Sequence, residues 1–193
     1  MPNLVTLLRL LLVPCFLWAS RERMFVLAFV LFVIAASSDS IDGMIARRWN
    51  MHSRLGALLD PAADKTLMVC GVLYYTFAKD IPVIRLPSWL TFTVFIRDFL
   101  IAFFAYLMYT RVHITRFPPS IYGKISTILQ MSVLSATIAV NAFAPWFPPG
   151  WMPRLLPVMA LLFRASMLMT LFSGWHYMNR ARRILSELSP AAA

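Results

Sequence analysis

Apolar residues form six long runs along the chain, separated by short polar or proline-containing breaks. The runs cover residues 4–20, 24–46, 55–78, 87–110, 121–144 and 153–178. Each is close to the ~20 residues that an α-helix needs to cross the ~30 Å hydrocarbon core of a bilayer. The pattern predicts an all-α, polytopic membrane protein with six transmembrane helices. Neither a linker nor an internal repeat divides the chain, so we expect a single membrane domain over residues 1–193.

The composition agrees with a membrane protein. Of the 193 residues 60% are hydrophobic and 13% are charged, and the net charge is +10. A soluble domain of this length rarely has so little polar surface. The basic residues lie between the apolar runs and form no stripe interleaved with aromatic residues. We therefore expect anionic lipid head groups and a phosphorylated substrate as partners, and no nucleic acid.

Lysine and arginine residues in the breaks predict the orientation, because positively charged loops tend to remain in the cytoplasm. With the N-terminus inside, eight basic residues fall on the inner side: Arg47, Arg48, Arg54, Arg111, Arg116, Arg180, Arg182 and Arg183. Five fall on the outer side: Arg21, Arg23, Lys79, Arg85 and Arg154. We expect an integral protein of a bacterial inner (cell) membrane with both termini in the cytoplasm.

Four of the eight acidic residues lie within 26 residues of one another, in the pattern D-x2-D-G-x2-A-R-x8-G-x3-D-x3-D. They are Asp39, Asp42, Asp60 and Asp64. Positions 39, 42, 43 and 46 share one face of the second predicted helix, and positions 56, 60 and 64 share one face of the third. Because the connection is short, these helices are expected to be antiparallel neighbours whose acidic faces can meet at the cytoplasmic side.

Four carboxylates cannot share a low-dielectric cleft alone, because like charges would drive protons onto some of them. Two Mg²⁺ or Mn²⁺ ions would offset this repulsion, since hard cations prefer oxygen ligands and a pair of them can clamp a diphosphate. Gly43 and Gly56 leave room for close approach, and Arg47 suits a phosphate contact. Any one aspartate could instead be a helix-end carboxylate neutralised by a nearby Arg or Lys. All four together, with the glycines and Arg47 in register, favour a metal site.

The span from Asp39 to Asp64 resembles the signature of the CDP-alcohol phosphatidyltransferase family at every fixed position. The resemblance implies a Mg²⁺- or Mn²⁺-dependent enzyme that transfers the phosphatidyl group of CDP-diacylglycerol to an alcohol and releases CMP. It implies that Asp39, Asp42 and Asp60 ligate metal, and that Asp64 completes the metal site and acts as general base. It implies a homodimer, and a CDP-diacylglycerol pocket lined by Gly43, Ala46, Arg47, Ser53 and Gly56.

The opening segment is also similar to the N-terminal segment of that family, which lies near the nucleotide. The similarity involves Asn3, Thr6 and Arg9, and it makes Asn3 and Thr6 candidates for substrate binding. Capping of the first helix by these two side chains is the alternative.

The candidates for binding the acceptor alcohol are basic residues of the later helices: Arg97, Arg111, Arg116, Lys124 and Arg164. Arg97 and Asp98 are helix neighbours whose side chains point about 100° apart, so we expect each to find another partner. A structural ion pair with Asp98 is the alternative to an acceptor role for the buried arginines. Arg111, Arg116 and Lys124 are expected to cluster at the inner ends of the fourth and fifth helices, where a solvated, lipid-facing role is the alternative.

Two branches of the family share features with Arg97-Asp98 and the later run Gly123-Lys124-x2-Thr127-x2-Gln130. Eukaryotic-type cardiolipin synthases use phosphatidylglycerol as acceptor. Phosphatidylglycerophosphate synthases use glycerol 3-phosphate and usually carry Arg-Glu in place of Arg-Asp. This departure favours phosphatidylglycerol, and therefore cardiolipin synthesis, with glycerol 3-phosphate as the alternative. A membrane prenyltransferase or a cation transporter is more remote, because the D-G-x2-A-R continuation is foreign to the first and inverted repeats are missing for the second.

Overall fold

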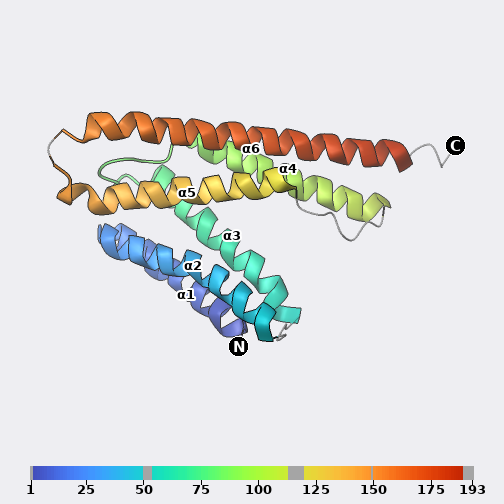
Figure 1. Ribbon diagram of the computed structural model, residues 1–193, viewed down its shortest axis with the longest axis horizontal. Coiled ribbons are helices and arrows are strands. Elements are labelled where there is room, and N and C mark those ends of the chain that lie inside the picture. Colours follow the sequence, from blue (N-terminus) through green and yellow to red (C-terminus); the bar gives the residue numbers. More distant parts are fainter. Residues whose placement is uncertain (1, 50–53, 113–119, 149, 189–193) are drawn as a thin grey trace. The chain divides into compact units, whose positions relative to one another are not determined.

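The computed structural model describes the backbone of residues 2–49, 54–112, 120–148 and 150–188, and the side chains of residues 8–37, 65–107, 110, 120–148 and 150–183. Within these ranges the chain is helical and contains no strand. The helices are α1 (Pro2–Arg21), α2 (Phe25–Trp49), α3 (Arg54–Phe77), α4 (Ser88–Val112), α5 (Ile121–Phe143), the 3₁₀ turn η1 (Ala144–Trp146) and α6 (Met152–Leu188) (Figure 1). The predicted all-α class is confirmed, and the six apolar runs correspond to the six α-helices.

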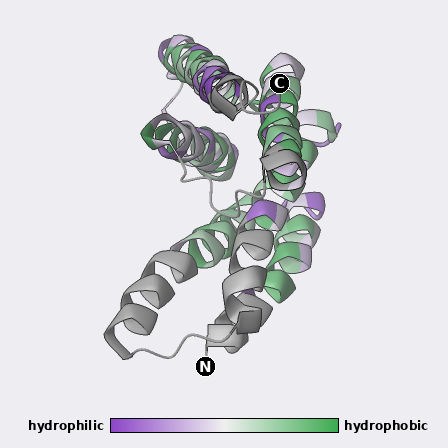
Figure 2. Cartoon of the chain, turned by 90° about the vertical axis from the view of Figure 1, so that its right-hand side faces the viewer, coloured by the Kyte–Doolittle hydropathy of each residue, from purple (hydrophilic) through white to green (hydrophobic). Residues whose placement is uncertain are grey.

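Three segments of the described chain are long and apolar enough to cross a membrane: Ser88–Leu107, Ile121–Trp146 and Met152–Arg183. A shorter apolar stretch covers Phe25–Ser37. Figure 2 shows hydrophobic residues along the described lengths of the helices. The protein is therefore an integral membrane protein, and the number of six membrane crossings remains a prediction.

Helix α6 is longer than its apolar run, because it ends at Leu188 rather than near residue 178. Its 37 residues correspond to ~55 Å, which exceeds the thickness of a bilayer core. The added turns contain Arg180, Arg182 and Arg183, together with alanine, leucine and glutamate. These are strong helix formers, so the helix continues where the apolar pattern stops.

The contacts divide the chain into two compact units. Unit 1 contains Met1–Leu86 and Leu134–Pro149, and unit 2 contains Pro87–Val133 and Gly150–Ala193. Helix α5 begins in unit 2 and ends in unit 1, so both units are built from segments that are distant in sequence. The single domain expected over residues 1–193 remains a prediction.

In unit 1, α1 packs against both α2 and α3, and α2 also contacts α3. The aromatic ring of Phe16 in α1 contacts the rings of Phe32 in α2 and Tyr75 in α3, with centroid separations of 5.8 and 6.2 Å. Ala28 and Ala35 of α2 are fully buried. Small residues such as these let membrane helices approach closely. The three helices therefore share one buried core.

The loop after α3 is attached to the end of α5 by Asn141. The Asn141 side-chain nitrogen donates to the carbonyls of Ile84 and Thr137, both at 2.8 Å, and its oxygen accepts from the backbone N–H of Val83 at 3.0 Å. Asn141 is only 2% exposed, so it satisfies backbone groups of this loop that water does not reach. In the same loop, the hydrogen bond from the Tyr74 hydroxyl, at 2.7 Å, holds the pKa of Asp80 below its usual range.

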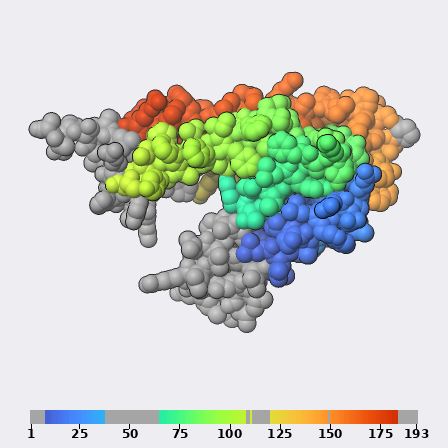
Figure 3. Space-filling view, turned by 180° about the vertical axis from the view of Figure 1, so that it is seen from behind, coloured from blue at the N-terminus to red at the C-terminus, as the bar shows by residue number. Residues whose placement is uncertain are grey.

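In unit 2, α4 packs against α6. Figure 3 shows the residues of α4 lying along those of α6. The first half of α5 joins this pair through hydrogen bonds to both helices. These contacts build the cavity described below.

We expect Asn141→Leu to lower the stability of the protein by about 1–3 kcal/mol, because buried N–H and C=O groups of the loop lose their partner. Thermal unfolding in detergent, followed by intrinsic fluorescence, measures the effect. Ser132→Leu makes a similar change at an exposed position of the same helix and should leave the melting temperature nearly unchanged. Equal melting temperatures for the two variants would contradict a clamping role for Asn141.

Candidate functional site

The helix segments that carry the sequence-predicted metal residues and most of the nucleotide residues lie at one end of unit 1. The start of α1, the end of α2 and the start of α3 all lie at that end, opposite the α1–α2 turn (Figure 1). Helix α1 carries Asn3 and Thr6, α2 carries Asp39, Asp42, Gly43, Ala46 and Arg47, and α3 carries Gly56, Asp60 and Asp64. Their side chains lie outside the described ones, and Ser53 lies outside the described residues altogether. For the residues on the three helices, the structure describes the backbone and therefore their positions along each helix.

The helical spacing of the aspartates can be compared with the buried faces of α2 and α3. Along α2 the buried stripe runs through Phe25, Ala28, Phe32 and Ala35. Continued at the same alternation of three and four residues, it reaches positions 39, 42 and 46. Along α3 the buried residues Met68, Gly71 and Tyr75 continue backward to positions 64, 60 and 56. Since residues three and four apart share a helix face, we expect both acidic sets on the faces that pack inside unit 1.

A buried arginine of α1 stands near the same level. Arg9 is 1% exposed and is the largest fully buried side chain of the described part. Arg9 stands seven positions before Phe16, and Asp39 seven positions after Phe32; the rings of the two phenylalanines are in contact. Because α1 and α2 form a hairpin, these equal steps bring the two backbone positions to about the same height. The resemblance of the N-terminal segment includes Arg9 without a role of its own, and its spacing with Val13 and Phe16 marks a buried face.

The donor set at this end of unit 1 is appropriate for divalent cations. Four carboxylates from two neighbouring helices can supply the oxygen ligands that Mg²⁺ and Mn²⁺ prefer. No group of three His, Cys, Asp or Glu side chains that could hold a metal is found among the described side chains. The four aspartates lie outside those side chains and remain the ligands that we expect.

A second group of predicted residues surrounds a cavity in unit 2. The cavity has a volume of about 510 Å³, within the range of small-molecule sites. It is lined by Arg97, Ile101, Ser120, Gly123, Lys124, Thr127, Ile128 and Tyr177. The structure thus brings Arg97 of α4 and Lys124 of α5 to one cavity.

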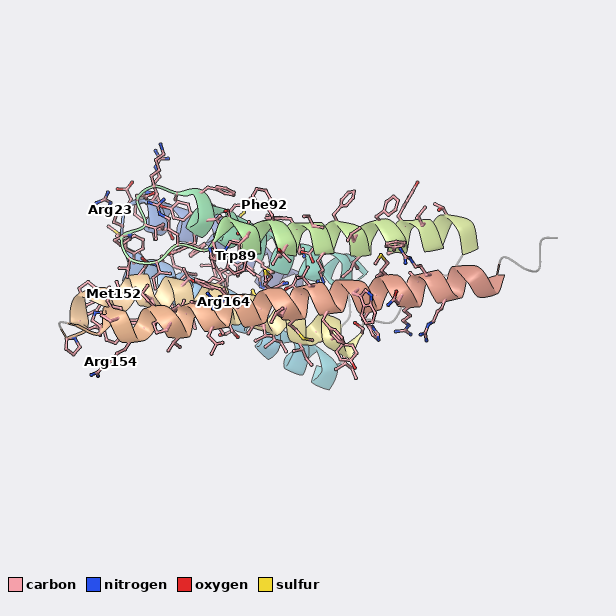
Figure 4. The ribbon with its side chains drawn as sticks, turned by 90° about the horizontal axis from the view of Figure 1, so that it is seen from above. Arg23, Trp89, Phe92, Met152, Arg154 and Arg164 are labelled. Carbon is pink, nitrogen blue, oxygen red and sulfur yellow. The ribbon has the colours of Figure 1, made fainter. Side chains whose placement is uncertain are left out.

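Of the other predicted acceptor residues, Arg164 is not part of the described lining. Arg164 is an exposed residue part-way along α6, labelled in Figure 4. Arg116 and the side chain of Arg111 lie outside the described part of the chain. Helix α5 begins beside Arg97, whereas Arg111 stands fourteen positions, or ~21 Å, farther along α4. Lys124 is therefore not at the end of α4 where the sequence pattern placed it, because α4 extends past the start of α5.

Arg97 and Asp98 pair with each other, which confirms the alternative of a structural ion pair. The expectation that their directions on the helix keep them apart was wrong, although Arg97 also bonds to Ser173 and Gly123. The Arg97 Nη1 atom lies 2.9 Å from Asp98 Oδ1, and the two side chains are 11% and 14% exposed. The 100° between neighbouring Cβ directions does not prevent contact, because the long arginine side chain bends back to the carboxylate. The pairing lowers the cost of placing either charge among apolar helices.

The Gly-Lys-x2-Thr-x2-Gln run combines a cavity face with a structural face. Gly123, Lys124 and Thr127 line the cavity. Gln130 is buried and donates from its amide nitrogen to Thr170 Oγ1 of α6 at 2.9 Å and to Ser126 Oγ at 3.2 Å. Ser126 and Thr170 also lie 3.2 Å apart, so three polar side chains satisfy one another between α5 and α6. The last position of the run therefore joins helices and does not reach the cavity.

Comparison with known proteins identifies similar sequences over almost the whole chain. The family model described as CDP-alcohol phosphatidyltransferase matches residues 1–172. A protein of Salmonella paratyphi A named CDP-diacylglycerol–glycerol-3-phosphate 3-phosphatidyltransferase is 32% identical over 189 residues, which cover 94% of each chain. A protein of the same name from Aquifex aeolicus is 35% identical over 139 residues, covering 71% of this chain and 75% of the relative. A probable phosphatidylglycerophosphate synthase of Mycobacterium tuberculosis is 30% identical, covering 99% and 86% respectively.

We expect Gln130→Met to lower thermal stability by about 1–2 kcal/mol, because the amide that links α5 to α6 is lost while the side-chain volume is kept. Since Gln130 does not line the cavity, the KM values for both substrates should stay within about twofold of the wild type. Thermal unfolding and steady-state kinetics on the folded fraction measure the two effects. A large rise in one KM with unchanged stability would assign Gln130 to substrate binding instead.

Proposed function

Because the chain belongs to the CDP-alcohol phosphatidyltransferase family, we propose that it transfers the phosphatidyl group of CDP-diacylglycerol to glycerol 3-phosphate and releases CMP. The observation that carries the proposal is the match to the family over residues 1–172, together with the four aspartates of the signature on two neighbouring helices, α2 and α3. Carboxylates on the inner faces of two neighbouring helices need cationic partners, and a diphosphate substrate held with divalent ions provides them.

Glycerol 3-phosphate is proposed as the acceptor because of the names of the relatives, two of which state this substrate. The preference for phosphatidylglycerol, drawn from Asp98 in place of the more usual glutamate, finds no support among them. The ion pair between Arg97 and Asp98 offers a reason. A residue paired with its own helix neighbour is a poor indicator of the acceptor, since the shorter carboxylate still reaches the guanidinium.

In this proposal the residues of unit 1 hold the diphosphate. Two Mg²⁺ or Mn²⁺ ions bound by Asp39, Asp42, Asp60 and Asp64 would offset the negative charge that builds on the phosphates. Gly43 and Gly56 keep the helices close to the substrate, and Arg47 binds phosphate oxygen. The nucleotide pocket is also lined by Ala46, Ser53, Asn3 and Thr6. Arg9 adds a buried positive charge to the acidic end of the unit.

Asp64 takes the proton in the transfer step. The acceptor hydroxyl oxygen forms a bond to the phosphorus of the phosphatidyl group, its proton passes to the Asp64 carboxylate, and the bond from phosphorus to the CMP oxygen breaks. A carboxylate is a weak base near neutral pH, so its position beside the hydroxyl is more important than its pKa. The basic residues Arg97, Arg111, Arg116, Lys124 and Arg164 remain the candidates for binding the acceptor.

The proposal includes the placement of the enzyme. Six helices cross a bacterial inner membrane, both termini are cytoplasmic, and the aspartates face the cytoplasm, where nucleotides and glycerol 3-phosphate are found. The enzyme acts as a homodimer within the bilayer. The eight inner basic residues against five outer ones support this orientation.

Purified protein with CDP-diacylglycerol and Mn²⁺ should release CMP when glycerol 3-phosphate is added, and far less with phosphatidylglycerol. Product lipids separated by mass spectrometry distinguish phosphatidylglycerophosphate from cardiolipin. A reaction without any acceptor is the control, and CMP release there would indicate a hydrolase. Cardiolipin as the main product would restore the phosphatidylglycerol hypothesis and overturn the proposed acceptor.

Asp64→Asn should lower kcat by about 100-fold or more while CDP and Mn²⁺ still bind, because it removes a base and leaves an oxygen ligand. Electron paramagnetic resonance of bound Mn²⁺ and CDP titration measure binding separately from turnover. Asp80→Asn is the matched control, since Asp80 lies in the loop after α3 and bonds to Tyr74. Wild-type turnover in Asp64→Asn would show that Asp64 is not the general base.

A further inference from the structure

The turn between α1 and α2 places an arginine where glycine is usual. Helix α1 ends in a Schellman motif, in which the Met24 N–H donates to the Ala19 carbonyl at 2.9 Å and the Arg23 N–H to the Ser20 carbonyl at 3.2 Å. Arg23 occupies the left-handed position of this motif, with a φ of 60°. A side chain is unfavourable in this conformation, and glycine avoids the penalty. An arginine kept there points to a role for its charge.

Arg23, labelled in Figure 4, lines a groove of unit 1 that we call the α2–α5 groove. The groove has a volume of about 560 Å³, a size in the range of small-molecule sites. Its apolar lining comes from the start of α2, including Leu27 and Val30, and from the end of α5 and η1, including Ala142 and Trp146. All of these segments belong to unit 1. Apart from Arg23, the polar residue of the lining is Asn141.

Asn141 has no hydrogen-bonding capacity left for a ligand. Its amide nitrogen donates to the carbonyls of Ile84 and Thr137. Its oxygen accepts from the N–H groups of Val83 and Ile84. Two donors and two acceptor positions are all that a side-chain amide offers. A ligand in the groove would therefore find apolar surface everywhere except at Arg23.

The Arg23 guanidinium is available to an anion. It is exposed and makes neither a hydrogen bond nor an ion pair within the described part of the chain. Asp80 accepts its hydrogen bond from Tyr74, which lowers the Asp80 pKa most, and Arg23 and Arg21 lower it further. The turn itself carries Arg21 and Arg23 against Glu22, so its net charge is positive.

The groove lies where apolar helix segments end. The segment Ile121–Trp146, long enough to cross a membrane, ends at Trp146, and the apolar stretch Phe25–Ser37 begins two residues after Arg23. Trp146 is 68% exposed, and exposed tryptophans are typical of the level of the lipid head groups. We therefore expect Arg23 at that level, and the groove residues one and two turns farther along α2 at the level of the acyl chains.

We propose that the α2–α5 groove binds an anionic phospholipid, with its phosphate on the Arg23 guanidinium and an acyl chain along the apolar residues of α2 and η1. One cation beside an apolar groove matches a molecule with a charged head and an apolar tail. A free phosphate ion would leave most of the lining uncovered. The groove is separate from the proposed diphosphate site, because Leu27 stands twelve positions, or ~18 Å, before Asp39 along α2.

The bound lipid stabilises the end of unit 1 that Asn141 holds together. Asn141 lines the groove and bonds to the loop after α3, so an acyl chain over it keeps water away from those hydrogen bonds. A ligand that binds only the folded protein raises its stability as the ligand concentration rises. The stability of the protein should therefore depend on the anionic lipid, whichever alcohol the enzyme uses as acceptor.

The test compares thermal unfolding in detergent micelles without lipid, with phosphatidylcholine, and with phosphatidylglycerol. At a phosphatidylglycerol concentration about tenfold above its Kd, the melting temperature should rise by about 3–6 °C, and phosphatidylcholine should have little effect. Arg23→Gly should abolish the rise. Because glycine suits the left-handed position, this variant should melt no lower than the wild type without lipid, so misfolding cannot explain the loss.

Two further variants separate this site from general attraction to charge. Val30→Trp keeps Arg23 but fills the apolar part of the groove from an exposed position, and it should also abolish the rise. Lys79→Gln is the matched control, since it removes one positive charge from an exposed position of unit 1 outside the groove lining, and it should keep the rise.

Native mass spectrometry from the same micelles should retain fewer phosphatidylglycerol molecules on Arg23→Gly than on the wild type. A full rise in melting temperature for Arg23→Gly would overturn the proposal and assign the effect to another site. An equal loss in Lys79→Gln would overturn it in favour of general surface charge. A rise of the same size with phosphatidylcholine or with inorganic phosphate would show that the groove does not select an anionic lipid.

Discussion

The structure depends on keeping charged groups on the inner faces of helices that otherwise bury only apolar residues. In unit 1 small and aromatic residues join α1, α2 and α3 in one core. In the proposed site helix packing determines where the carboxylates stand, because a helix carries its register from the core to its end. Aromatic contacts of Phe16 hold α1, α2 and α3 together, and α2 and α3 are the helices that carry the aspartates.

In unit 2 an ion pair within one helix neutralises charges that lie among apolar residues. Arg97 and Asp98 neutralise each other within one helix, and the remaining guanidinium contact is made with Ser173 on α6. Buried polar groups of α5 and α6 are likewise satisfied between helices, as the contacts of Gln130 show. These bonds hold the helices around a cavity whose described lining also contains the exposed Lys124. A membrane enzyme can thus separate charges that stabilise the fold from charges that are available to a substrate.

The assignment of the acceptor illustrates how a motif can mislead. Asp98 differs from the glutamate usual in one branch, and this difference alone favoured phosphatidylglycerol. In the structure Asp98 pairs with Arg97. A side chain that neutralises a neighbour is under a constraint of charge, which aspartate and glutamate meet equally well. The names of the relatives, which cover most of the chain, point instead to glycerol 3-phosphate.

By itself the sequence determined the all-α class, the limits of the helices to within a few residues except at the end of α6, and the spacing of the four aspartates. These features are local, since hydrophobic runs and helical periodicity depend on residues close together in the chain. It left the pair of Arg97 with Asp98 as one alternative, and it could not predict that α5 begins beside Arg97 or that Asn141 holds the loop after α3. Only the tertiary structure decided these contacts, because they depend on where one helix begins along another. That offset comes from packing between distant segments and leaves no period in the sequence.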